Sequence, residues 1–180
     1  MKTWMIAGCL AAVAATGAAA EPGLGDEVYG ARAEAGRTEI EARYGRLGGG
    51  PDNGTDALKL EATHHVSDRL RLAAFGEFSR DPGAPRRAEE AGFEAIYTLG
   101  RAAGIDFALY GEYALGFSGN PDAVEAKLIA ERLRGPLDVR LNLVGEKPLA
   151  GHAPIELSYA ARADYAFGDV AVGLEACRAA

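Results

Sequence analysis

The chain has 180 residues, a formal net charge of −7 and 48% hydrophobic residues. This acidic balance argues against a nucleic-acid partner, because no basic patch is available to neutralise phosphates. No internal segment is long and apolar enough to form a transmembrane helix. If the protein crosses a membrane, it therefore crosses it as β-strands.

The first twenty residues are predicted to be a secretory signal peptide. Lys2 precedes an uncharged, apolar run from Trp4 to Ala20, which ends in the small residues of an A-x-A cleavage site. The run is short for a membrane anchor, and no basic flank follows it. Cys9 ends a lipobox-like sequence, but cleavage there would leave too short an apolar core. We expect cleavage after Ala20.

The mature chain is expected to contain a short N-terminal segment, 21–26, and one β-barrel domain, 27–178. It retains a single cysteine, Cys177, so an intrachain disulfide is excluded. Length alone indicates one domain.

Beyond Asp26, apolar and polar residues alternate with a period of two, which is typical of strands with one apolar face. In Ile105–Phe117, for example, Leu109 and its neighbours at even spacing are apolar, whereas Asp106 and Glu112 fall in the other phase. Residues 123–134 are also good helix formers, but they alternate in the same way. We predict an all-β, antiparallel up-and-down meander of about ten strands, at 27–35, 38–47, 56–64, 69–80, 88–99, 105–117, 122–133, 137–147, 155–167 and 170–178.

The predicted connections alternate in length. Longer ones lie near 48–55, 81–87 and 148–154, and shorter ones near 36–37, 65–68, 100–104, 134–136 and 168–169. Membrane barrels show this asymmetry, with short periplasmic turns and longer outer loops.

Charged side chains fall almost entirely in the polar phase of these strands. A charge on a lipid-facing surface costs about 2–4 kcal/mol for Arg or Lys at the bilayer midplane, which would explain the exclusion. Small residues accompany the charges, as suits the interior of a narrow barrel. We predict that the lumen is lined by Arg32, Glu61, Arg71, Glu94, Glu112, Lys127, Arg140, Glu146, Arg162 and Asp164. Acids outnumber bases in this phase, so an open pore would favour cations.

The signal peptide, the alternation and the loop asymmetry together resemble Gram-negative outer-membrane β-barrel proteins of the porin-like class. The resemblance spans nearly all of the mature chain and names no subfamily. It implies a barrel in the outer membrane, contact with outer-membrane lipid and with the barrel-assembly machinery, and a structural or passive-pore role. Aromatic rims would comprise Tyr29, Tyr44, Phe78 and Phe117 at the long-loop end, and Tyr97, Tyr165 and Phe167 at the other.

Two features depart from this class. Such barrels usually end in an aromatic residue, whereas this chain ends Glu175-Ala176-Cys177-Arg178-Ala179-Ala180. We therefore expect a truncated C-terminus and an incomplete larger barrel. In addition, a short turn at 36–37 would start the first strand outside the cell, whereas such barrels start in the periplasm.

We find no catalytic constellation, metal site or cofactor motif, and expect no enzymatic activity. The serines lack a G-x-S-x-G setting, and His64-His65 is predicted to be an exposed pair near a turn. The alternative function is a soluble periplasmic β-barrel that binds a small apolar ligand. The oligomeric state is left open.

Overall fold

The computed structural model describes residues 24, 27–168 and 170–179. The predicted signal peptide, 1–20, lies outside the described residues. So does the segment 21–26, apart from Leu24.

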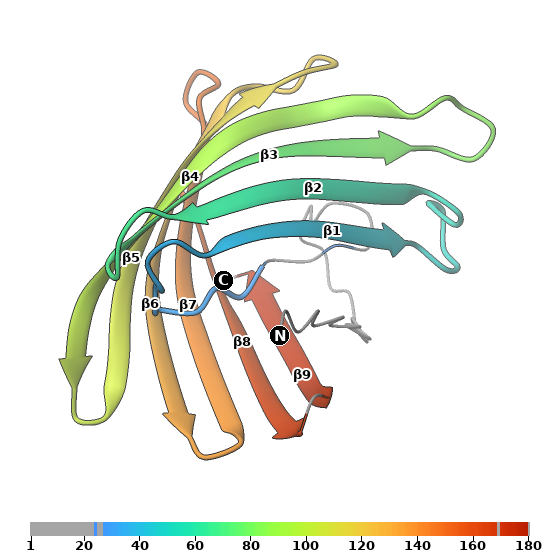
Figure 1. The fold of residues 1–180 in the computed structure, drawn as a ribbon. Helices are drawn as coiled ribbons and strands as arrows, with labels where there is room; N and C mark the ends of the chain where they lie inside the picture. The colour runs from blue at the N-terminus through green and yellow to red at the C-terminus, as the bar shows by residue number, and fades with distance from the viewer. Residues whose placement is uncertain (1–23, 25–26, 169, 180) are drawn as a thin grey trace.

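Nine strands form one antiparallel sheet, and each strand pairs with the next strand along the chain. Figure 1 shows the sheet curled into a half-barrel. The predicted all-β meander is therefore confirmed, and the described residues contain no helix. The strands are β1 (Thr38–Arg46), β2 (Asp56–His65), β3 (Leu70–Arg80), β4 (Arg87–Ala102), β5 (Ile105–Gly116), β6 (Ala123–Arg134), β7 (Leu137–Pro148), β8 (Glu156–Phe167) and β9 (Val170–Ala179).

The connections have two lengths, as the sequence predicts, although the loop at 117–122 is one more long connection than expected. Longer loops follow β1, β3, β5 and β7, at 47–55, 81–86, 117–122 and 149–155, whereas short turns follow the even-numbered strands. Because successive strands run in opposite directions, the longer loops gather at one end of the sheet and the short turns at the other.

The two faces of the sheet have opposite character. On β7, Leu141 and Leu143 are 41% and 51% exposed, whereas Asn142 between them is fully buried. The same holds across the sheet: large apolar side chains cover the convex face, and buried charges occupy the concave face. A water-soluble globular protein has the reverse arrangement, with apolar side chains inside.

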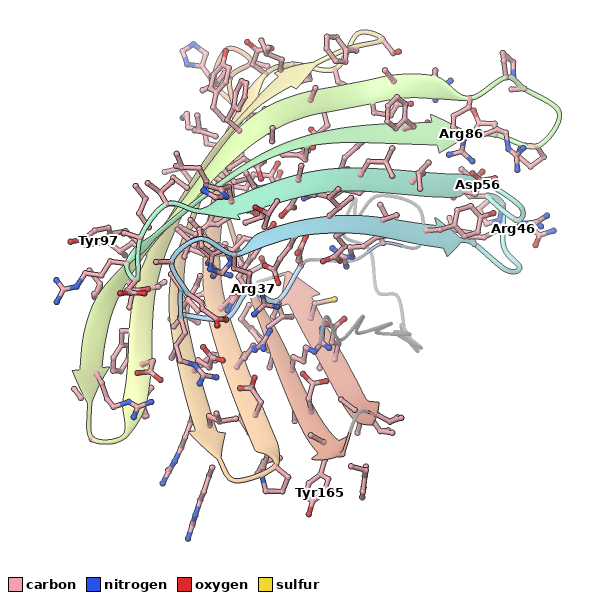
Figure 2. All side chains as sticks on the ribbon, in the orientation of Figure 1. Arg37, Arg46, Asp56, Arg86, Tyr97 and Tyr165 are labelled. Atoms are coloured by element: carbon pink, nitrogen blue, oxygen red, sulfur yellow. The ribbon has the colours of Figure 1, made fainter. Side chains whose placement is uncertain are left out.

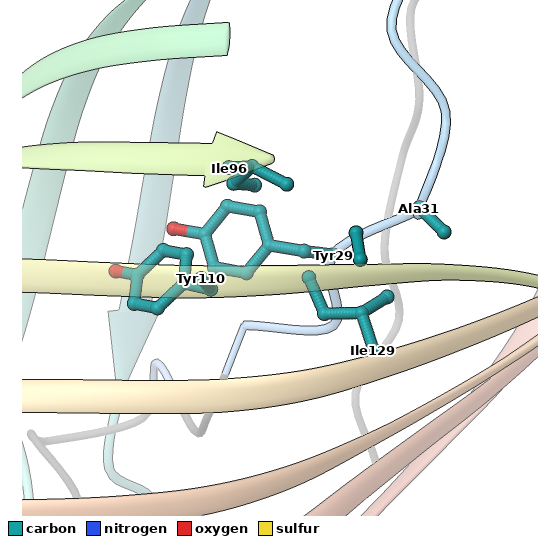
Figure 3. Close-up of a cluster of buried hydrophobic side chains, with 6 residues drawn as sticks. Tyr29, Ala31, Ile96, Tyr110 and Ile129 are labelled. Carbon is teal, nitrogen blue, oxygen red and sulfur yellow. The ribbon is translucent and has the colours of Figure 1, made fainter. Parts of the chain in front are cut away.

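The prediction of a strand at 27–35 is wrong. These residues form an irregular extended segment, here called the N-terminal segment (Glu27–Ala35), which lies against the concave face. Figure 3 shows Tyr29 and Ala31 packed among Ile96, Tyr110 and Ile129 of the sheet. Alternation indicates an extended backbone, but it does not reveal whether that backbone pairs with a strand or contacts side chains. The sheet consequently has nine strands and not ten.

The N-terminal segment also accounts for the expected start of the first strand outside the cell. The turn at 36–37 does not join two strands, and the sheet begins with β1 at its short-turn end. Tyr29 is correspondingly not part of an aromatic rim, because its ring is buried and stacks on Tyr110 with 4.8 Å between ring centroids.

Close packing inside the curl requires a glycine in β4. A Cβ on Gly92 would collide with the carbonyl oxygen of Tyr113 and would lie 2.7 Å from the Phe75 ring. The absence of a side chain lets the Phe75 ring lie over the β4 backbone inside the half-barrel.

Candidate functional site

The N-terminal segment is held in the concave face through its backbone. The side-chain amide of Asn142 accepts a hydrogen bond from the Tyr29 N–H at 2.7 Å and donates one to the Tyr29 carbonyl at 3.1 Å. The Glu131 carboxylate accepts from the Ala31 N–H at 2.8 Å, and the Thr98 hydroxyl donates to the Ala31 carbonyl at 2.7 Å. Side chains of the curled sheet, here called the wall, therefore make the hydrogen bonds to the backbone of the segment that a neighbouring strand would otherwise make.

Two cations of the wall and one of the segment add to this set. The Arg71 guanidinium donates to the Gly30 carbonyl, and the Lys127 ammonium donates to the Glu27 carbonyl at 3.3 Å. Arg32 places its guanidinium 2.7 Å from the Glu131 carboxylate.

Lys59 lies at the centre of a cluster of carboxylates. Its ammonium is 3.2 Å from Glu94, 3.6 Å from Glu27 and Glu77, and 3.9 Å from Glu61, and it lies 4.4 Å from the centroid of the Phe75 ring. The Lys59 side chain is buried, so each of these attractions is screened less than it would be in water. The Tyr29 hydroxyl donates to Glu94 at 2.9 Å, which links the N-terminal segment to this cluster.

A row of carboxylates crosses five strands at one level of the wall and ends at the exposed Glu156 of β8. Glu94, Glu112, Glu125 and Glu146 are directly opposite one another in successive strand pairs. Like charges in directly opposed positions are destabilising. Lys127 partly offsets the row, since its ammonium lies 3.0 Å from Glu125, and Tyr110 donates its hydroxyl proton to Glu112. We call Glu94, Glu112, Glu125 and Glu146 the carboxylate row.

At a second level of the wall, arginines are paired with carboxylates. Arg140 pairs with Asp138 at 2.7 Å and with Glu131 at 3.6 Å. Arg162 pairs with Asp164 at 2.6 Å and with Glu175 at 3.2 Å. These pairs satisfy partly buried charges that would otherwise be costly to desolvate.

The residues predicted to line the lumen thus gather into four groups. Glu61 and Glu94 belong to the Lys59 cluster. Glu94, Glu112 and Glu146 belong to the carboxylate row, and Lys127 is its counter-charge. Arg140, Arg162 and Asp164 belong to the level of arginine–carboxylate pairs. Arg71 and Arg32 contact the N-terminal segment or belong to it, so Arg32 reaches the concave face from this segment and not from a strand.

Residues that organise the concave face were missing from the predicted set, notably Lys59, Asn142, Glu131, Tyr110 and Phe75. Tyr110 and Phe75 do carry a sequence signal, because each places an aromatic ring in the polar phase of its strand. An aromatic ring gains little from exposure to water in a lumen. Here the Tyr110 ring packs beneath Lys127 and the Phe75 ring packs beneath Lys59. Asn142 gives no such signal, because its role depends on the position of the N-terminal segment.

A separate ionic group lies at the long-loop end. The fully buried Asp56 carboxylate accepts hydrogen bonds from Arg80 at 2.6 and 2.9 Å and from Arg86. Figure 2 shows Asp56 and Arg86 near the same end of the sheet, beside the loops after β1 and β3. This group ties the two loops together.

The loop after β5 is fixed by Asp122. The Tyr113 hydroxyl donates to its carboxylate at 2.6 Å and the Gly116 N–H donates at 3.1 Å. These hydrogen bonds, that of Tyr113 first, hold the pKa of Asp122 below its ordinary value.

The prediction of an exposed histidine pair is wrong for His65, which is buried. Its Nδ1 accepts a hydrogen bond from the Glu34 N–H at 2.8 Å, so the ring proton lies on Nε2 and is donated to Glu39 at 3.2 Å. His65 thereby anchors the chain between the N-terminal segment and β1. Within the described residues, no group of His, Cys, Asp and Glu side chains is arranged to hold a metal ion.

Most of the predicted rim aromatics lie on the convex face. Tyr44 is exposed in β1, and Tyr165 and Phe167 lie at the short-turn end with 4.6 Å between their ring centroids. In Figure 2, Tyr97 projects outward from the half-barrel and Tyr165 lies at the end of β8.

Comparisons with protein-family models, curated proteins and solved structures find no match to this chain. The described part of the chain contains no helix that is long and apolar enough to span a membrane.

Proposed function

We propose that this chain forms the wall of an outer-membrane β-barrel with a charged lumen, in a structural or passive-pore role. The barrel-assembly machinery would insert it after export by the signal peptide. The longer loops would face outward and the short turns would face the periplasm, as in membrane barrels.

One observation carries the proposal: apolar side chains are exposed on the convex face, while charges are buried on the concave face. On the convex face, Phe93 near the middle of β4 is 70% exposed, and Leu157 in the first half of β8 is 61% exposed. On the concave face, Lys59 and Glu94 are buried. Exposing so large an apolar band to water is unfavourable, whereas a bilayer would cover it. Strands of nine to sixteen residues also meet the length that a tilted membrane strand requires.

The same observation weighs against the alternative of a soluble barrel that binds a small apolar ligand. Such a ligand would need an apolar interior. The concave face instead carries the Lys59 cluster, the carboxylate row and the Arg140 and Arg162 pairs. Its main apolar cluster is already filled by Tyr29 and Ala31.

Cell fractionation tests the membrane assignment. We expect the mature protein to sediment with outer membranes, to resist extraction by alkaline carbonate and to dissolve in detergent. Recovery in the periplasmic extract without detergent would overturn the proposal.

The carboxylate row defines the ion preference of any pore. Its negative charge would attract cations and repel anions inside a low-dielectric wall. In a salt gradient across a planar bilayer, the reversal potential of conducting channels should report cation preference. Measured in channels that conduct once the N-terminal segment is displaced, Glu125→Gln should reduce that preference, whereas Glu34→Gln, at an exposed site outside the strands, should not.

A further inference from the structure

The N-terminal segment occupies the concave face of the sheet, although no strand pairs with it. Val28, Tyr29, Gly30 and Ala31 are buried there. Tyr29 stacks on Tyr110, and Lys127 lies 4.9 Å from the centroids of both rings. The segment therefore fills space that an open lumen would leave to water.

The contacts that hold the segment are unlike those of a strand in a sheet. They come from side chains on several strands: Arg71 of β3, Thr98 of β4, Lys127 and Glu131 of β6, and Asn142 of β7. Each is directed to a backbone carbonyl or N–H of the segment. Releasing the segment would break none of the backbone ladders of the sheet.

From this arrangement we propose that residues 27–35 are a removable plug, and that the concave face is a binding site for this one extended segment of the chain. The inference rests on the proposed function, since a plug matters only if the wall encloses a pore. In the seated state the lumen is closed. When the segment leaves, it uncovers Asn142, Glu131 and Glu94.

Gly30 offers a way to unseat the segment without altering the wall. A Cβ at this position would lie 3.2 Å from the Glu131 carboxylate and 3.3 Å from the Arg140 guanidinium, closer than ordinary contact. A valine adds two further methyl groups. Gly30→Val should therefore displace the segment, whereas Ala35→Val, at an exposed position of the same segment, should leave it seated.

Seating is measured first, without reference to conduction. In the mature chain carrying Cys177→Ser, which removes the exposed thiol, Val28→Cys places a thiol at a buried position. We expect a polar maleimide to label this thiol at least tenfold faster in the Gly30→Val background than in the Ala35→Val background. Equal rates, or labelling of the seated protein as fast as in urea, would overturn the plug.

Conduction is measured second, in planar bilayers with protein whose folding is verified by heat-dependent gel mobility. The chain that retains Gly30 should be silent, Gly30→Val should conduct, and a synthetic peptide of residues 27–36 should close the Gly30→Val channels. A scrambled peptide should have no effect. Should Gly30→Val fail to fold, Tyr29→Ala removes the stacked ring without adding bulk and is read in the same way.

The two measurements separate the plug from the proposed function. Strong conduction by a Val28→Cys protein whose thiol stays protected from the maleimide would overturn the plug while upholding the pore. An inserted Gly30→Val protein that is labelled but never conducts would overturn both the gate and the passive-pore role. Recovery of the protein in the soluble fraction would overturn the membrane assignment, and the labelling contrast would then still report on seating.

Discussion

Individual residues of the concave face have roles that depend on what lies directly across from them. Gly92 is the clearest steric case, since Phe75 and the Tyr113 carbonyl leave no room for a Cβ. Lys59 is the clearest electrostatic case, since its one ammonium lies within 3.9 Å of four carboxylates. Each residue can be tested against a matched position that lacks the feature.

Gly92→Ala should destabilise the protein by about 1–3 kcal/mol, because either the Phe75 ring or the β5 backbone has to move. Gly111→Ala is the matched control, as a Cβ there has nothing within 4 Å. Urea unfolding in detergent, followed by far-UV circular dichroism, would give both values. Equal stability of the two variants would contradict the packing described for the inside of the curl.

Lys59→Met should cost about 3–5 kcal/mol at neutral pH, as expected when one partner of a buried ionic group is removed. Glu27, Glu77 and Glu94 would then face one another without their shared cation. Acidification should recover part of the loss, because protonation removes the repulsion between the carboxylates. Arg69→Met, at an exposed turn position, should change stability little at any pH. A pH-independent effect of Lys59→Met would argue against the ionic cluster.

Among the larger elements, the loops and the strands depend on different physics. The loop at 117–122 is exposed and held by a few hydrogen bonds to Asp122. The strands are held by continuous backbone ladders, and their two faces differ in the side chains that they carry, apolar on the convex face and largely charged on the concave face.

The loop after β5 should become disordered in acid. The folded pKa of Asp122 is below its ordinary value, so its stabilising effect is complete above the ordinary pKa and is lost as the pH falls through the folded pKa. Proteolysis within 117–122 should accelerate across that acidic range. Asp122→Asn should be cleaved rapidly even at neutral pH. A wild-type loop with pH-independent cleavage, after correction for protease activity, would contradict this assignment.

The convex face of β7 should tolerate charge only near its ends. Leu141→Arg should reduce the stability of the protein folded into vesicles by about 2–4 kcal/mol, because its position lies in the middle of the strand. Leu137→Arg, at the first residue of β7 and on the same face, should cost about 0–1 kcal/mol. Equal costs would indicate that depth in a bilayer has no bearing on this face.

For the whole molecule, the two edges of the sheet are the main surface open to further strand pairing. β1 and β9 each pair with one neighbour among the described strands. Both are odd-numbered strands of a meander and run in the same direction, so direct contact between them would be the one parallel pair in an otherwise antiparallel sheet. Long unpaired edges also favour association with other strands.

Hydrogen exchange in detergent should show this difference between edge and centre. We expect the amides of β5 to exchange most slowly, and those of β1 and β9 to exchange faster by at least tenfold, because unpaired edges open without breaking a second ladder. Slow exchange in β1 and β9 at all protein concentrations would indicate direct closure of the ring. Slow exchange that disappears on dilution would indicate pairing between copies.

Features that depend on local sequence pattern could be predicted from the sequence, whereas features that depend on long-range contacts could not. All nine strands are predictable to within a few residues, because each carries mainly apolar side chains on one face and mainly polar ones on the other. The segment 27–35 carries the same alternation, yet it is held by Asn142, Glu131 and Thr98 instead of a strand. The two-residue period alone does not tell whether a segment pairs as a strand or contacts side chains of the concave face.

Local pattern was enough to specify the class of fold, the alternating loops and the separation of charges from apolar residues, since these depend on each residue and its near neighbours. Other features exist only in the folded chain: Lys59 gathers four carboxylates, Glu94, Glu112, Glu125 and Glu146 align in one row, and the N-terminal segment fills the concave face. These features depend on strand register and on how the sheet curls. Register and curl bring together residues up to 113 positions apart in the chain, such as Tyr29 and Asn142, and no local pattern specifies contacts across such a separation.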